Sequence, residues 1–105
     1  MFETIDEINI AYEEDGKLLT KQLDKSILSR GGWTTIMFLY QELDKTTNTY
    51  KTPKISIRRY QKRGGTFRQQ SKFTISNKKQ GEKICEVLKE WFDKISDESA
   101  NEQEE

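Results

Sequence analysis

Histidine is absent from this chain of 105 residues, and there is a single cysteine, Cys85. Without histidine the chain lacks the usual general base at neutral pH and the commonest metal ligand. One cysteine forms no intramolecular disulfide, and without a histidine partner it makes neither a zinc site nor a paired thiolate nucleophile. The sequence therefore predicts a protein that is not an enzyme and that uses no metal and no other cofactor.

Long apolar runs and phosphate-binding glycine motifs are also missing. No stretch approaches the ~20 apolar residues that a membrane span needs, and the first ten residues lack the basic region of a signal peptide. Four of the six glycines form two isolated pairs, Gly31-Gly32 and Gly64-Gly65, which is not the pattern of a phosphate-cradling loop. These absences predict an intracellular protein, in the cytoplasm, nucleoid or nucleus, with no membrane partner.

The composition limits the size of the core. With 32% hydrophobic and 34% charged residues, a chain of this length buries only a modest apolar core. We therefore expect one domain, either as a small α+β layer or as a fold completed by dimerisation.

Charge is the feature that is present in excess, and it is segregated along the chain. Residues 51–83 hold eleven of the eighteen lysines and arginines and one acid, Glu82, so their net charge is +10 in a chain whose total is zero. A block of uncompensated positive charge repels itself, and a partner with regularly spaced negative charge relieves that repulsion. The phosphate backbone of a nucleic acid is the commonest such partner.

Periodicity predicts an acidic N-terminal arm over residues 1–16 and strands over residues 17–29 and 33–43. The second of these strands is apolar on both faces, so that either both faces are covered or one is a binding or dimer surface. A polar loop is expected over residues 44–53.

A basic hairpin is predicted next, in which Ile55 and Ile57 face the core. A two-residue turn at Gly64-Gly65 would place Ile57 opposite Lys72, on the wrong face. We therefore expect a three-residue loop, which pairs Ile57 with Phe73 and Lys62 with Arg68. The residues expected to point outward are basic or aromatic, with no acid: Lys54, Arg58, Tyr60, Lys62, Arg68 and Lys72.

An amphipathic helix follows a cap at Ser76 or Asn77, because large apolar residues recur at helical spacing from Ile84 to Ile95. Its stripe and the two-sided apolar strand predict a homodimer, with interface residues Ile84, Leu88, Trp91 and Phe92. Residues 97–105 contain five acids, no base and no large apolar residue, which predicts a disordered acidic tail. This tail either plays a passive role or competes weakly with nucleic acid for the basic surface.

Residues 55–60 (Ile-Ser-Ile-Arg-Arg-Tyr), the basic link 62–72, the strand 73–76 and the helix to Ile95 resemble the transcriptional coactivator family of the positive-cofactor-four type. The resemblance covers residues 33–95. It implies a curved four-stranded antiparallel sheet followed by one C-terminal helix, in an intertwined homodimer that grips single-stranded DNA with basic and aromatic side chains. The family often has a glycine-rich basic run where this chain has residues 68–72, and an aromatic residue where it has Gln80 or Gly81.

The leading hypothesis is that residues 17–96 form a domain that binds single-stranded DNA, or RNA, with little sequence preference. The alternatives are a transcription adaptor that binds acidic protein surfaces, and a protein that binds duplex DNA or RNA. Partners in transcription, replication or repair are all compatible with the sequence. Besides the outward row, the candidate contacts are Trp33, Arg59, Arg63, Lys78 and Lys79.

Overall fold

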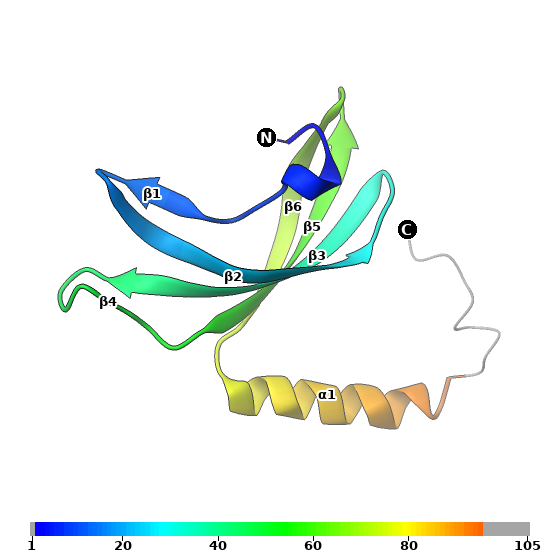
Figure 1. Cartoon of the computed structure of the whole chain (residues 1–105). Helices are drawn as coiled ribbons and strands as arrows, with labels where there is room; N and C mark the ends of the chain where they lie inside the picture. The colour runs from blue at the N-terminus through cyan, green and yellow to red at the C-terminus, as the bar shows by residue number, and fades with distance from the viewer. Residues whose placement is uncertain (1, 96–105) are drawn as a thin grey trace.

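The computed structural model describes residues 2–95, so the predicted tail at 97–105 lies outside the described residues. A 3-10 turn, η1 (Ile5–Glu7), precedes six antiparallel strands and one helix (Figure 1). The strands follow the order β1-β2-β3-β5-β6, with β4 paired to β3. This confirms a small α+β fold with a C-terminal helix, and adds two short strands to the four predicted. The elements are β1 (Tyr12–Glu14), β2 (Lys17–Ser29), β3 (Trp33–Asp44), β4 (Thr49–Tyr50), β5 (Lys54–Arg63), β6 (Thr66–Ile75) and α1 (Lys78–Phe92).

The core lies on the concave face of the sheet, beneath residues 2–10, which we call the N-terminal segment (Figure 1). Ile8 and Ile10 of this segment are buried, with Ile8 only 1% exposed. They belong to one cluster with Ile36, Phe38, Tyr40, Tyr60 and Phe67 of the sheet. The expectation of an arm outside the domain is therefore wrong, because the apolar face of β3 is covered by the N-terminal segment and not by the helix.

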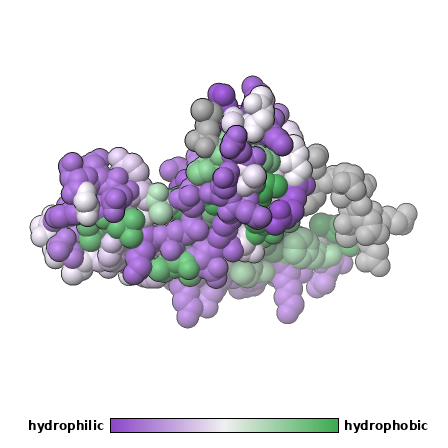
Figure 2. Space-filling view, turned by 45° about the horizontal axis from the view of Figure 1, so that its top comes forward, coloured by the Kyte–Doolittle hydropathy of each residue, from purple (hydrophilic) through white to green (hydrophobic). Residues whose placement is uncertain are grey.

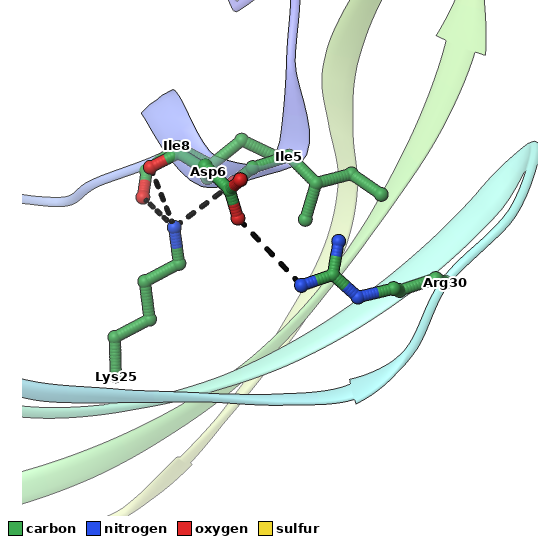
Figure 3. Close-up of polar contacts among 5 residues, drawn as sticks. All are labelled: Ile5, Asp6, Ile8, Lys25 and Arg30. Atoms are coloured by element: carbon green, nitrogen blue, oxygen red, sulfur yellow. Dashed lines mark hydrogen bonds and ion pairs between the residues drawn. The ribbon is translucent and has the colours of Figure 1, made fainter.

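Polar contacts hold the N-terminal segment against β2 (Figure 3). The Lys25 ammonium donates to the carbonyl oxygens of Ile5 at 2.9 Å, Asp6 at 3.2 Å and Ile8 at 2.7 Å. Arg30 pairs with the Asp6 carboxylate at 3.6 Å. Lys25 thus binds three carbonyl oxygens of the N-terminal segment at once, and the Ile5 oxygen also accepts the N–H of Ile8. Burial lowers the pKa of Lys25, against the opposing charge of Asp6.

The β5–β6 hairpin reaches the predicted pairing of Ile57 with Phe73 by a different route. Its loop is a two-residue turn at Gly64-Gly65, with φ of 58° and 84°, and Lys62 pairs with Phe67. A β-bulge near Gln70 then shifts the register by one residue, so Ile57 still pairs with Phe73. The predicted pairing of Lys62 with Arg68 is wrong, because the extra residue lies in the strand rather than in the loop. The prediction that Ile55 and Ile57 face the core is also wrong, because they pair with Leu39 and Met37 on the convex face, outside the buried cluster.

Helix α1 begins where the sequence indicates. Asn77 Oδ1 accepts the backbone N–H of Gln80 at 2.8 Å, and Gln80 Oε1 accepts the N–H of Ser76 at 2.9 Å. The helix ends at Phe92, short of the predicted Ile95. No helix among residues 2–95 is long and apolar enough to cross a membrane.

The apolar stripe of α1 is not packed into the core. Trp91 is 58% exposed and Phe92 61% exposed, and Cys85 is exposed as well. Between α1 and the convex face of the sheet lies an apolar groove of about 580 Å³. Its lining includes Met37, Leu39, Ile55, Ile57, Ile84 and Leu88.

Replacing Lys25 by Met should release the N-terminal segment, because the three charged hydrogen bonds are lost while the chain length of the side chain is kept. We expect the free energy of unfolding in urea to fall by about 1.5–3 kcal/mol. The amide of Ile8, which donates to Ile5 at 3.2 Å, should also exchange faster. Lys17→Met, at an exposed lysine of the same strand, is the control. Equal losses in both variants would contradict the assigned role of Lys25.

Candidate nucleic-acid interface

Positive charge gathers on the β5–β6 hairpin. Residues 58–72, which we call the basic hairpin, contain six bases and no acid: Arg58, Arg59, Lys62, Arg63, Arg68 and Lys72. Figure 1 shows this hairpin rising to the top of the sheet beside the N-terminal segment. Figure 2 shows that hydrophilic residues cover most of the face in view, with apolar atoms visible in smaller patches at the lower left and lower right.

The structure divides the predicted outward row between the two faces of the sheet. Residues paired directly across strands point to the same face. Tyr60 pairs with Thr34, and both are buried on the concave face, where Tyr60 is 3% exposed. The prediction that Tyr60 points outward is therefore wrong, because the N-terminal segment covers it. Burial raises the pKa of the Tyr60 hydroxyl, and the charge of Arg58 and a hydrogen bond from it act in the opposite direction.

The convex face of the basic hairpin combines arginine with aromatic rings. The Arg59 guanidinium lies 4.4 Å from the centre of the Trp33 ring. Arg63 Nε donates to Gln61 Oε1 at 2.8 Å, which places a second arginine on this face. Phe73, which was expected in the core, is 52% exposed there on the edge strand β6. The sequence carried no signal for Phe73, because its exposure depends on which face the N-terminal segment covers.

The concave face holds the remaining predicted bases of β5. Arg58 Nε donates to Ser56 Oγ at 3.0 Å, and Nη1 donates to Gln69 Oε1 at 3.1 Å. Lys54 pairs with Glu42 at 3.1 Å, so its charge is already compensated. Lys62 lies 5.6 Å from the ring of Phe67, and Lys72 is exposed opposite Arg58. Arg68, by contrast, pairs with Gln61 between the turn and the bulge, so it lies on the convex face and is exposed at the sheet edge.

Two groups of predicted residues lie away from the basic hairpin. Lys78 and Lys79 are exposed at the start of α1, which follows the end of β6 opposite to the turn at Gly64-Gly65. Ile84 and Leu88 line the groove between helix and sheet. Within residues 2–95 there is no group of three or more side chains that could hold a metal ion.

None of the family models, curated proteins or solved structures compared with the chain matches it. The resemblance to the coactivator family therefore stays a prediction from the motif at residues 55–60 and the elements that follow it.

Tyr60 should make the protein less stable at alkaline pH. Its folded-state pKa lies above the ordinary value of 10.0, so the stability it contributes is complete below that pH and is lost as the pH rises through the folded pKa. The fall in the free energy of unfolding between about pH 9 and pH 11 should therefore be larger for the natural chain than for Tyr60→Phe. The same fall in the natural chain and in Tyr60→Phe would contradict this.

Proposed function

We propose that the chain binds single-stranded nucleic acid, DNA in preference to RNA, without strong sequence selection, through the convex face of the basic hairpin. The observation that carries the proposal is the presence of Arg59, Arg63, Trp33 and the exposed Phe73 on one face. Arginines neutralise phosphates, and aromatic rings stack on bases of any identity. Arg68 at the sheet edge adds a further phosphate contact from the neighbouring strand.

The cation–π pair is suited to this role for a physical reason. A guanidinium over an indole keeps its planar face on the ring while its N–H groups remain at the edge, where a phosphate oxygen is bound. Trp33 is half-buried, so its ring is held by the sheet rather than free to rotate. A nucleic-acid strand laid along β5 would then meet the basic side chains of Arg59 and Arg63 in succession, with Phe73 on the adjacent β-strand, β6.

Duplex DNA is the second candidate, and one observation favours it. The basic hairpin is a two-stranded ribbon with positive charge on both faces, from Arg58 and Lys72 on one and Arg59 and Arg63 on the other. A two-stranded ribbon fits the major groove of B-form DNA. The transcription adaptor is the third candidate, since an acidic protein surface would be attracted by the same charges.

We also propose that the chain acts as a homodimer through α1 and the apolar groove. The same surface offers an exposed projection, Trp91 and Phe92, and a recess lined by Met37 and Leu39. A twofold axis allows each copy to insert its projection into the recess of the other, which is the self-complementary contact of a symmetric dimer. An uncovered apolar patch of this extent is rarely left on a monomer.

Binding of a dT oligonucleotide should weaken steeply with salt. For three phosphate contacts, from Arg59, Arg63 and Arg68, log K against log salt should have a slope of about −2. Arg59→Gln combined with Arg63→Gln should make the slope shallower, and Phe73→Ala should cost about 1–3 kcal/mol through lost stacking. Lys45→Gln, at an exposed loop residue, should leave both quantities unchanged.

Gel shifts with single-stranded DNA, duplex DNA and RNA at matched salt separate the three candidates. The proposal requires the tightest binding to the single strands, and DNA above RNA. Tighter binding to duplex DNA would favour the ribbon-in-groove candidate. Absence of any shift, or binding that does not respond to salt, would reject nucleic acid and leave the adaptor.

Sedimentation equilibrium tests the dimer. The natural chain should sediment as a dimer at tens of micromolar, and Trp91→Asp should dissociate it because a buried carboxylate at the seam has no counterion. Glu90→Lys, which changes charge on the exposed side of the helix, should remain dimeric. A monomeric natural chain under these conditions would refute the dimer.

A further inference from the structure

A second site lies on the concave side of the basic hairpin, opposite the proposed strand-binding face. It is a pocket of about 300 Å³ between the N-terminal segment and the edge strand β6. Three separate parts of the chain build it: the N-terminal segment, β5 and β6. Its lining residues are Phe2, Asn9, Arg58, Tyr60, Phe67, Arg68 and Gln69.

Arg58 is the charged group in this pocket whose surroundings are best suited to binding an anion. It is half-buried, and its guanidinium is held by neutral partners, Ser56 Oγ at 3.0 Å and Gln69 Oε1 at 3.1 Å. No carboxylate among residues 2–95 lies within ion-pairing distance of it, whereas Lys54 on the same strand is paired with Glu42. A partly desolvated, oriented cation without a counterion is a preformed site for an anion.

The other lining groups define what the anion is attached to. Lys72, which pairs with Arg58 on the same face, places a second positive charge beside the lining, and two cations match a phosphate monoester, which carries a charge close to −2 at neutral pH. The half-buried ring of Phe2, with the small exposed parts of the buried Tyr60 and Phe67, provides apolar contact for a planar base, and the amides of Asn9 and Gln69 offer both donors and acceptors. A volume at the lower limit of small-molecule sites, about 300 Å³, suits one such unit rather than a chain.

We propose that this pocket binds a single nucleoside 5′-monophosphate group, with the phosphate on Arg58 and Lys72 and the base against the aromatic lining. The proposal rests on the proposed function for the class of its ligand. The same chemistry is offered by a free nucleotide and by the 5′-phosphorylated end of a strand. In the second case the concave pocket holds the strand end while the convex face binds the interior.

The first test titrates the full isotope-labelled chain with AMP, GMP, CMP and UMP, and follows the NMR signals of the Arg58 Nε–H and the Gln69 amide. Adenosine and inorganic phosphate are the comparison ligands. We expect at least one nucleotide to shift both signals at about a tenth of the concentration that phosphate or adenosine requires. Arg58→Gln should abolish the shift, and Lys45→Gln, which removes the same charge from an exposed loop, should not.

Arg58 bonds to the buried Ser56, so its variant must be shown by thermal unfolding to keep the fold. Lys72→Gln, at an exposed position, is the second variant and should weaken nucleotide binding without affecting folding. No shift with any nucleotide at about 10 mM, where ligands of millimolar affinity are largely bound, would overturn the proposal. An equal response to inorganic phosphate would also overturn it, since the pocket would then be a plain anion site.

The second test identifies the source of the ligand. A dT oligonucleotide with a 5′-phosphate should bind about tenfold more tightly than the same strand with a 5′-hydroxyl if the strand end is held, as expected for a gained charge-assisted contact. Nucleotide binding without this difference would assign the pocket to free nucleotides. Circular single-stranded DNA has no end, so its binding reports on the convex face alone. If circular DNA binds and no nucleotide does, the proposed pocket ligand is rejected and the proposed function of the convex face stands.

Discussion

The packing of the N-terminal segment onto the concave face of the sheet is the contact on which the rest of the structure depends. β3 is apolar on both faces, and only one of them can become the core of a chain this small. Ile8 and Ile10 decide which one, by filling the curl over Ile36 and Phe38. Because Lys25 donates to three carbonyl groups of the same segment, its position is fixed by directional bonds as well as by burial.

The location of the positive charge follows from that choice. With the concave face filled, Tyr60 and Phe67 become core residues, while Trp33 and Phe73 remain on the convex side. The two-residue turn at Gly64-Gly65 contributes as well, because it sets Arg68 beside Gln61 rather than Lys62, before the bulge near Gln70 shifts the register. The basic hairpin therefore has two chemically different sides. One is an open face of arginine and aromatic rings, and the other is a small pocket closed by the N-terminal segment.

Local patterns predicted the strands, the helix and its cap, because each depends on residues close in sequence. The alternation at Ile55 and Ile57 and the cap at Asn77 are examples. The same patterns were insufficient to say which face of an alternating strand is buried, since Tyr60 and Phe73 exchange places when a distant segment packs on one side. They also left open where an extra residue is accommodated, because a longer loop and a bulge give Ile57 the same partner. The clustering of basic residues was visible in the sequence. The pocket around Arg58 was not, because Phe2 and Asn9 are far from Arg58 in sequence and come close to it only in the folded chain.

The central claim is that the N-terminal segment fills the concave face in solution. Proton nuclear Overhauser spectra of the full chain test it most directly, with Ile8 methyl groups selectively labelled. The account predicts cross-peaks from these methyl groups to ring protons of the aromatic residues in the buried cluster, which contains Phe38, Tyr40, Tyr60 and Phe67. Ile8 methyl signals at random-coil positions, without contacts to any of these rings, would contradict it.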